Sequence, residues 1–474
     1  MIRIELDAGK IREIYTQEKK GEKGRKGRRD SLTKKLNDRI TAHINKTPKT
    51  DYTENKAAVE IVTKFLEIYF QKDRTNTKTK TDIICDYLFR ERKEMEETIL
   101  AFWECVGNVW AAKLLNEKGV TISFDKKGED IKNLSKWSGA KQYIASITDT
   151  TTNEKRDERE KRIKKVITKE LKVFFLYDSG KDIDDYDKFI KEVVEDNDAF
   201  KTVKFRYQND LYVEKTAKVN GEWGALDILA YIFNYGWLTE PSDLLPPNLR
   251  HQILSTIDAP VCPYCNRQYV TLFKDKSNNN NGSISQKEDS KTTADLDHFY
   301  IKSAYPFLAL NAYNFIPSCQ ICNSRFKGDT DFHYRPHLYP YSELLGDEIT
   351  FVLDNPVRMT ESTAWRGWEK PGGTKILDII EIKAHNEEAE NSVGTFHLEE
   401  VYQSHVDYIY EILWKHVAYN KDRLTSLLDN FKGLFDKNEA KEMIFGQYLS
   451  DDKLYKRPLA KLTRDILDDL NQTR

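Results

Sequence analysis

Two Cys-x-x-Cys pairs, Cys262/Cys265 and Cys319/Cys322, constrain the fold of this chain more than any other feature of its sequence. Two thiolates from each pair complete a tetrahedral set of four sulfur ligands, which is how structural zinc is held. Pro263 favours a tight turn inside the first pair. In a long chain this spacing is typical of a metal site and not of a disulfide framework. The sequence therefore predicts a four-cysteine zinc site that joins two distant segments.

The length and composition of the chain indicate a folded protein of several domains. Its 474 residues are too many for one ordinary core, so two or three domains are expected. Aromatic residues make up 12% of the chain, and disordered chains are poorer in aromatics. No apolar run approaches the roughly 18 residues that span a bilayer, and residues 1–10 lack the apolar stretch of a secretory signal. We therefore expect a cytoplasmic protein without a membrane partner.

The charge of the chain is nearly balanced. A net charge of −2 excludes a uniformly basic nucleic-acid binder, so any contact with phosphates has to rest on local patches. One such patch runs from Lys19 to Arg29, where lysines and arginines are interleaved with glycines. The glycines favour a mobile loop over a helix face. The patch is either an arm that grips phosphates or a solvated surface loop.

Hydrophobic spacing divides the chain into three parts and favours an α+β fold. Residues 1–245 carry apolar residues at three- and four-residue spacing, as in 57–70, and are expected to be mainly helical. Residues 246–345 hold both cysteine pairs and a polar, flexible insertion at 276–291. Residues 346–474 are expected to begin with short strands and to end in helices. The expected strands of this last part are 348–353 and 376–383.

Between the two cysteine pairs lie residues suited to phosphodiester hydrolysis. That reaction needs a nucleophilic water, a base that deprotonates it and a cation on the phosphate. Asp297 and His298 are adjacent in a β-like run, so their side chains diverge, one toward a metal and the other toward the attacking water. Asn323, directly after Cys322, can supply a second metal contact from a following helix. Asn314 can hydrogen-bond the histidine or its local backbone and hold the ring.

These residues resemble the HNH, or ββα-metal, nuclease superfamily. The segments LDHF and NAYNFIPSCQICNSRFKG carry the resemblance, framed by the upstream C-x-x-C, and the match spans Val261 to Tyr341. It is most similar to the branch with DH and then N-x-x-P-x-C-x-x-C-N-x-x-K. Many members have histidine at the last position, which is asparagine here. The resemblance implies a small ββα-metal module with these roles: His298 as the general base, Asn314 as the middle asparagine, and Asp297 and Asn323 as ligands of one Mg²⁺ or Mn²⁺.

Basic and acidic neighbours of the module extend this interpretation. Lys327, one helical turn beyond Asn323, is with Lys302 and Arg325 a candidate for gripping backbone phosphates. Asp295, in the same run as the DH pair, is expected to face solvent, and the second alternative is that it helps at the metal. The continuation PHLYPYSE and GDEITFVL resembles the HNH proteins encoded beside ATPases in bacterial anti-phage systems, the Septu type among them. That resemblance implies a role in defence and an ATPase partner, and the chain has no phosphate-binding glycine loop of its own.

Two rival interpretations stay open beside a metal-dependent endonuclease that cuts DNA. In the first, the chain is a zinc-stabilised binding or scaffold protein whose HNH fold has lost catalysis. The presence of Asp297, His298, Asn314 and Asn323 counts against this, because a decayed site commonly loses its base or its metal ligand. In the second, the chain is a toxin that cuts RNA, which differs in substrate only. Incubation with both polymers separates the two substrates.

Overall fold

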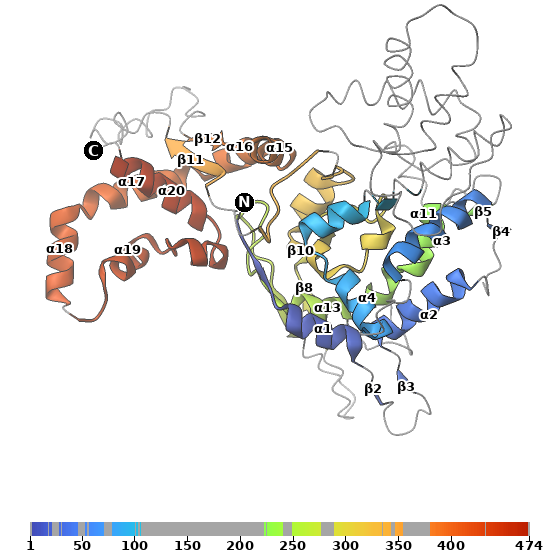
Figure 1. Ribbon diagram of the computed structural model, residues 1–474. Coiled ribbons are helices and arrows are strands. Elements are labelled where there is room, and N and C mark those ends of the chain that lie inside the picture. The colour runs from blue at the N-terminus through green and yellow to red at the C-terminus, as the bar shows by residue number, and fades with distance from the viewer. Residues whose placement is uncertain are drawn as a thin grey trace, which may run out of the picture. The chain divides into compact units, whose positions relative to one another are not determined.

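The computed structural model combines helices with small two-stranded sheets, and the α+β mixture expected from the sequence is confirmed (Figure 1). The structure describes residues 2–17, 19–20, 28–29, 31–45, 53–54, 56–70, 78–99, 101–102, 105, 222–223, 225–239, 249–275, 289–333, 335–342, 347–353, 380–431 and 433–472. Within these residues, no helix combines the length and the apolar character needed to cross a membrane.

The chain folds into two compact units that differ in composition. The first, here called the mixed unit, comprises residues 1–10, 250–299 and 315–474. The second, here called the helical unit, comprises residues 11–249 and 300–314. This division differs from the expected three parts, because the cysteine-rich region and the C-terminal region form one unit, and the segment 300–314 joins the N-terminal helices.

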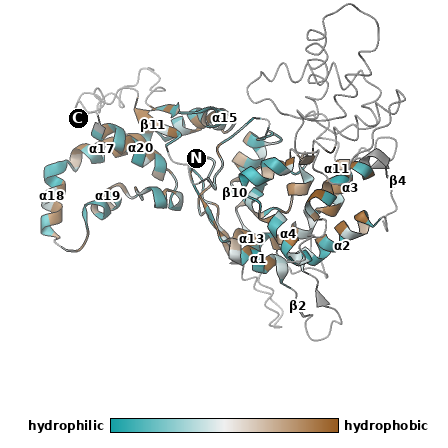
Figure 2. Ribbon diagram, in the orientation of Figure 1, coloured by the Kyte–Doolittle hydropathy of each residue, from teal (hydrophilic) through white to brown (hydrophobic). Residues whose placement is uncertain are grey.

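The helical unit is built from short amphipathic helices. Side-chain caps begin two of them: Ser31 accepts a hydrogen bond from the backbone of Lys34, and Thr79 forms a capping box with Asp82. Apolar residues on α3 and α11 appear brown in Figure 2. The helices are α1 (Ala8–Thr16, of which the first turn belongs to the mixed unit), α2 (Leu32–Ile44), α3 (Lys56–Phe70), α4 (Lys80–Leu88), α11 (Ala225–Ile232) and α12 (Gly236–Thr239).

Two pairs of two-residue strands accompany these helices. β4 (Thr53–Glu54) lies parallel to β5 (Glu222–Trp223). β2 (Lys19–Lys20) lies antiparallel to β3 (Arg28–Arg29), so the ends of the basic patch pair with each other where a loop was expected. The middle of that patch, 21–27, lies outside the described residues.

The segment 300–314 contributes to the core of the helical unit. Phe307 of η4 (Pro306–Leu308) packs against Phe65 and Phe102, with ring centroids 4.9 and 5.0 Å away. The hydroxyl of Tyr87 donates to the carbonyl oxygen of Phe307 over 3.1 Å, and that of Tyr15 donates to the carbonyl oxygen of Leu310 over 3.0 Å. The short helix η5 (Ala312–Asn314) ends the segment.

The mixed unit begins with a chain of small sheets. β1 (Glu5–Leu6) pairs with β6 (Ile257–Asp258), just after α13 (Leu249–Leu254). β7 (Leu272–Asp275) pairs with β8 (Asp289–Thr292) in a hairpin, so the last residues of the expected flexible insertion are a strand. The residues between these strands, 276–288, lie outside the described part of the chain.

The C-terminal part has the expected order of strands and then helices. β11 (Ile349–Leu353) pairs with β12 (Ile380–Ala384), and residues 376–379 of the second expected strand lie outside the described residues. Asp465 and Asp469 of the last helix accept hydrogen bonds from the backbone N–H groups of Phe351 and Leu353 over 3.1 and 3.0 Å, so this helix is fastened to the sheet. The helices are α15 (Glu387–Thr395), α16 (Leu398–Tyr402), η8 (Gln403–His405), α17 (Val406–Ala418), α18 (Lys421–Asn430), α19 (Lys437–Phe445), η9 (Asp451–Lys456) and α20 (Ala460–Gln472).

Candidate active site and metal centre

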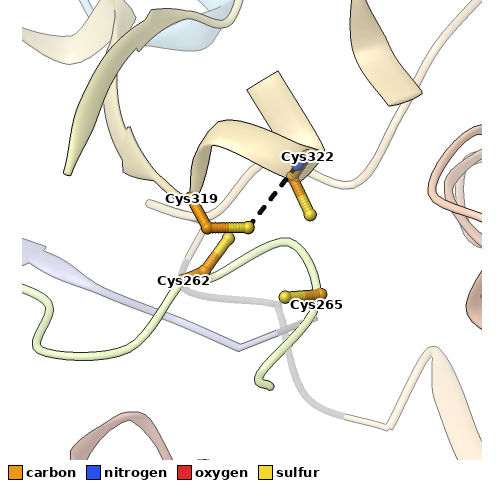
Figure 3. Close-up of side chains that lie close together, drawn as sticks. All are labelled: Cys262, Cys265, Cys319 and Cys322. Carbon is orange, nitrogen blue, oxygen red and sulfur yellow. Dashed lines mark hydrogen bonds between the residues drawn. The ribbon is translucent and has the colours of Figure 1, made fainter. Parts of the chain in front are cut away.

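The four cysteines of the two Cys-x-x-Cys pairs come together, as the sequence predicted. All four are buried, and their sulfur atoms lie within 4.8 Å of one another. Figure 3 shows Cys262 and Cys265 on a loop facing Cys319 and Cys322 on a helical turn, with the four side chains pointing toward a common centre. Four buried thiols at this separation could bind a metal such as zinc, which takes four sulfur ligands in tetrahedral geometry.

The thiols influence one another's ionisation. A hydrogen bond from Cys262 lowers the pKa of both Cys265 and Cys319, whereas burial raises the pKa of Cys262 itself. The backbone N–H of Cys322 also donates to the sulfur of Cys319 over 3.5 Å, drawn dashed in Figure 3. Hydrogen bonding to Cys262 in turn raises the pKa of Cys322. Thiolate is the form of cysteine that binds metal, so a cation held by all four sulfur atoms would displace the protons of Cys262 and Cys322.

The first cysteine pair is fastened to the C-terminal helices. Asn266, directly after Cys265, adopts a left-handed backbone conformation with φ 49°. Its side chain accepts from the backbone N–H of Lys461 over 3.2 Å, and its carbonyl oxygen accepts from that of Leu459 over 2.7 Å. The hydroxyl of Tyr402 donates to the carbonyl oxygen of Cys265 over 2.6 Å. The loop that carries the first cysteine pair is therefore part of the core of the mixed unit.

A short hairpin and a helix follow between the two pairs. β9 (Asp295–His298) pairs antiparallel with β10 (Phe315–Ser318), and His298 lies opposite Phe315 in the register. The next element is η6 (Ile321–Lys327), a turn of π-helix in which the N–H of Gly328 donates to the carbonyl oxygen of Asn323 over 3.1 Å. π-Helical turns are rare and are often found at functional sites. The order strand, strand, helix is that of a ββα arrangement.

The inner contact between β9 and η6 is a buried ion pair. Lys327 donates to Oδ1 of Asp297 over 2.7 Å and also to the carbonyl oxygen of His298. The other carboxylate oxygen, Oδ2, accepts from the hydroxyl of Tyr264 over 2.6 Å. Burial and the charge of Asp297 raise the pKa of Tyr264 well above its usual value, so its hydroxyl stays a donor. Both oxygens of the expected metal ligand Asp297 are thus engaged within the protein.

The outer contact between β9 and η6 joins Asp295 to Asn323. Oδ2 of Asp295 accepts from Nδ2 of Asn323 over 3.0 Å, and Nη2 of Arg250 lies 3.8 Å from Oδ1. Two residues along a strand and one turn along a helix cover similar lengths, about 6.6 and about 5.4 Å. The two pairs therefore fit the same spacing: Asp295 lies beside Asn323, and Asp297 lies beside Lys327.

His298 lies on the opposite face of β9 from the two aspartates. Its ring is edge-on to that of its cross-strand neighbour Phe315, with centroids 5.2 Å apart, and the residue is only 4% exposed. The side chains of Asp297 and His298 diverge, because successive residues of a strand point to opposite faces. The expected base is nearly covered by protein.

Asn314 organises the segment between the two strands through the backbone. Its Oδ1 accepts from the N–H of Tyr300 over 2.7 Å, and its Nδ2 donates to the carbonyl oxygens of Tyr300 and Leu308 over 3.0 and 3.2 Å. Of the two partners that the sequence left open, the histidine or the local backbone, these bonds are made to the backbone. The residue is fully buried in the helical unit.

The three basic residues expected at phosphates are in different surroundings. Lys327 is 2% exposed and its ammonium is engaged in the buried ion pair, so in this arrangement it cannot reach a phosphate. Arg325 is exposed on η6. Lys302 is exposed in the helical unit, where its ammonium lies 4.8 Å from the centre of the Tyr235 ring.

Three residues of the site were not predicted from the sequence. Tyr264 holds Asp297, Asp295 holds Asn323, and Arg250 lies beside Asp295. Two of them carry a signal in the sequence. Tyr264 is a polar aromatic inside the Cys-x-x-Cys turn of the first pair, and Asp295 shares a strand face with Asp297 by two-residue spacing. Arg250 precedes the cysteines by a whole helix and strand, and no local pattern distinguishes it.

No protein family, curated protein or solved structure matches this chain.

Proposed function

We propose that this protein is a metal-dependent endonuclease of the HNH type, with DNA as its substrate. The proposal rests on one observation. A strand carrying Asp297 and His298 on opposite faces packs against a helical turn carrying Asn323, and a cluster of four cysteines holds that turn. Hydrolysis of a phosphodiester requires a base for the attacking water and a cation at the phosphate, and adjacent histidine and aspartate side chains on opposite faces of a strand can serve these two tasks separately.

In this proposal His298 takes the proton of the attacking water. A neutral imidazole serves as a base near neutral pH, and Phe315 holds the ring at its edge. Because the residue is 4% exposed, the ring has to be uncovered before water reaches it. A nuclease in a cell has to be restrained, and a covered base supplies such a restraint until nucleic acid or a partner opens it.

The ligands for the two proposed metals fit to different degrees. The four cysteines suit a structural zinc ion that fastens η6 to the loop of the first pair. For Mg²⁺ or Mn²⁺, Asn323 offers an amide oxygen, since its nitrogen is bound to Asp295. Asp297 offers no open oxygen while Lys327 and Tyr264 hold it. A bound cation would supply positive charge to the phosphate, with Asn323 as its first contact.

The same engaged Asp297 favours the second candidate function. A nuclease needs a carboxylate that is accessible to the metal ion. In a scaffold protein that kept the zinc-stabilised fold but lost catalysis, Asp297 could stay in its buried ion pair with Lys327. An anti-phage role with an ATPase partner is a further part of the proposal. It is supported by the resemblance of 336–353 to HNH proteins of such systems and by the covered base, which suits a protein that a partner activates.

The test is cleavage of plasmid DNA and of RNA by the full chain with Mg²⁺ or Mn²⁺. The variants are His298→Ala and a matched control, His385→Ala, an exposed histidine that hydrogen-bonds Thr350 on the β11–β12 sheet. Bound zinc is measured in every sample. Cleavage lost in His298→Ala and kept in His385→Ala, at equal zinc content, is the expected result.

Other outcomes decide between the alternatives. Cleavage of RNA alone supports the toxin interpretation. Cleavage that survives His298→Ala contradicts the assigned base. A zinc-loaded protein that cuts neither polymer, with and without the proposed ATPase partner, supports the scaffold interpretation.

A further inference from the structure

We propose that Asp295 is a positioning residue that fixes the side-chain amide of Asn323 with its oxygen directed away from the protein contact and available to a cation. From the sequence, Asp295 was expected to face solvent, with a contribution at the metal as the second alternative; its side chain is 32% exposed and bonded on two sides. This inference rests on the proposed function, because it assigns a purpose to the orientation of a proposed cation ligand.

The chemistry of the pair sets the orientation of the amide. An ionised carboxylate only accepts hydrogen bonds, and of the two ends of an asparagine amide only the nitrogen donates. The 3.0 Å contact between Oδ2 of Asp295 and the amide of Asn323 therefore has to involve Nδ2. Since nitrogen and oxygen lie on opposite sides of the amide, Oδ1 of Asn323 points away from Asp295.

The second partner of Asp295 fixes the carboxylate itself. Nη2 of Arg250 lies 3.8 Å from Oδ1 of Asp295 and donates to the carbonyl oxygen of Ala294 over 3.2 Å. The guanidinium thus bridges the side chain of Asp295 and the backbone of the residue before it. A positive charge so close makes Asp295 a poor direct ligand for a second positive charge, and it leaves the carboxylate in one place to orient its neighbour.

An asparagine without such a partner would be a weak ligand. The last torsion of its side chain is broad, so before a cation binds the amide can present its nitrogen as readily as its oxygen, and ordering it lowers the affinity. Groups that orient a metal ligand commonly change metal affinity by about 10- to 100-fold when removed. The backbone of Asn323 cannot hold its own side chain, because its N–H and its carbonyl oxygen both take part in helical hydrogen bonds.

The experiment measures the affinity of the full-length, zinc-loaded protein for Mn²⁺ by electron paramagnetic resonance, which reads free Mn²⁺ and needs no cleavage. The variants are Asp295→Ala, Asp295→Asn and Asn323→Ala, with Asp329→Ala as an exposed control of equal charge change. Asp295→Ala should weaken Mn²⁺ binding by about 10- to 100-fold. Asp295→Asn should stay within about 3-fold of the native protein, because its carbonyl oxygen can accept the same hydrogen bond. Zinc content reports that each variant is folded.

Each outcome bears on a different claim. Equal affinity in Asp295→Ala and the native protein overturns the positioning role while Asn323→Ala still binds weakly. Equal losses in Asp295→Asn and Asp295→Ala overturn it in favour of a direct effect of the negative charge. Native affinity in Asn323→Ala, or no Mn²⁺ binding by the native protein, overturns the proposed cation site and with it this inference.

Discussion

At the scale of single residues, the Asp297–Lys327 pair decides how β9 and η6 meet. The two side chains are 6% and 1% exposed, and a charge in such a place is tolerated only with a partner. Lys327 also contacts the carbonyl oxygen of His298, and its ammonium lies 4.9 Å from the centre of the Phe332 ring. The lysine thus holds the strand at the position of the proposed base.

Replacing Lys327 by methionine should destabilise the mixed unit by about 3–5 kcal/mol. The new side chain fills a similar volume but leaves Asp297 as a buried charge with only Tyr264 as a partner, and breaking a buried pair on one side costs this much. The measurement is urea denaturation followed by tryptophan fluorescence and circular dichroism.

The control is Arg325→Met, which removes an exposed cation from the same helix and should shift stability by no more than about 0.5 kcal/mol. The double substitution Lys327→Met with Asp297→Leu should recover much of the loss, since replacing both ions by apolar groups is often neutral. A Lys327→Met protein as stable as the native one would contradict the importance of the pair.

A second residue-scale feature is the contact between Arg267 and His405. Nε of Arg267 donates to Nε2 of His405 over 2.8 Å, which requires a neutral imidazole with its proton on Nδ1. Burial lowers the pKa of His405, and the positive charge of Arg267 lowers it further. The folded state therefore prefers the uncharged histidine.

Stability of the mixed unit should fall as the pH drops below about 6.5, the usual pKa of histidine. Between the usual pKa and the lowered pKa of His405, the imidazole is protonated in the unfolded chain but not in the folded chain. The contribution of His405 to stability is therefore full above the usual pKa and decreases as the pH falls toward the lowered value. The measurement is the urea midpoint at about pH 7.5, 6.5 and 5.5, which brackets that value. His405→Gln can still accept from Arg267 and should show a smaller decrease. An identical pH dependence in both proteins would rule out His405 as its source.

At the scale of elements, the cysteine cluster fastens the ββα arrangement from two sides. Cys319 and Cys322 flank the start of η6, while Cys262 and Cys265 lie in a loop bound to the C-terminal helices. A metal at their centre would join these segments. Because a metal binds the folded arrangement and hardly the unfolded one, its binding free energy adds to folding stability.

Replacing Cys319 by serine should remove the bound metal and loosen the second half of the module. We expect about one zinc per chain in the native protein and little in the variant, with faster amide hydrogen exchange in β9, β10 and η6. Helices α2, α3 and α4 belong to the other unit and should exchange as before. Cys85→Ser, which alters a buried cysteine in α4 outside the cluster, should keep its zinc. Native exchange in metal-free Cys319→Ser would contradict a structural role for the metal.

Helices and the cysteine cluster were predicted correctly where the spacing of residues along the sequence indicates them. The cysteine spacing indicated the cluster, and the apolar spacing indicated α3 and the C-terminal helices. The contacts of Asp295 and Lys327 could not be predicted, because they depend on how a π-helical turn lies along a strand. The β7–β8 hairpin was missed for another reason: its second strand, Asp289–Thr292, is polar and lies in a segment whose composition is typical of a flexible loop.

At the scale of the whole molecule, the chain passes from one unit to the other within a single hairpin. It leaves the mixed unit after Phe299, the residue that follows β9, and returns at Phe315, the first residue of β10. The segment between them is held by Asn314 and packs in the core of the helical unit. No sequence pattern predicted this, because an aromatic-rich run such as FLALNAYNF fits any core. The connection makes the stability of the helical unit relevant to the proposed site.

Replacing Phe65 by alanine tests this connection. Phe65 is fully buried in α3 and contacts Phe102 and Phe307, so its loss should cost about 3–5 kcal/mol in the helical unit. Hydrogen exchange should become faster throughout 300–314 and at the first pairs of β9 and β10 next to it, while zinc content stays unchanged. Ile68→Ala is the control, because Ile68 lies on the same helix at 41% exposure. If exchange in β9 and β10 stays native while 300–314 loosens, the hairpin is independent of the helical unit. If both change, a ligand or partner that stabilises or loosens the N-terminal helices can act on the strand that carries His298.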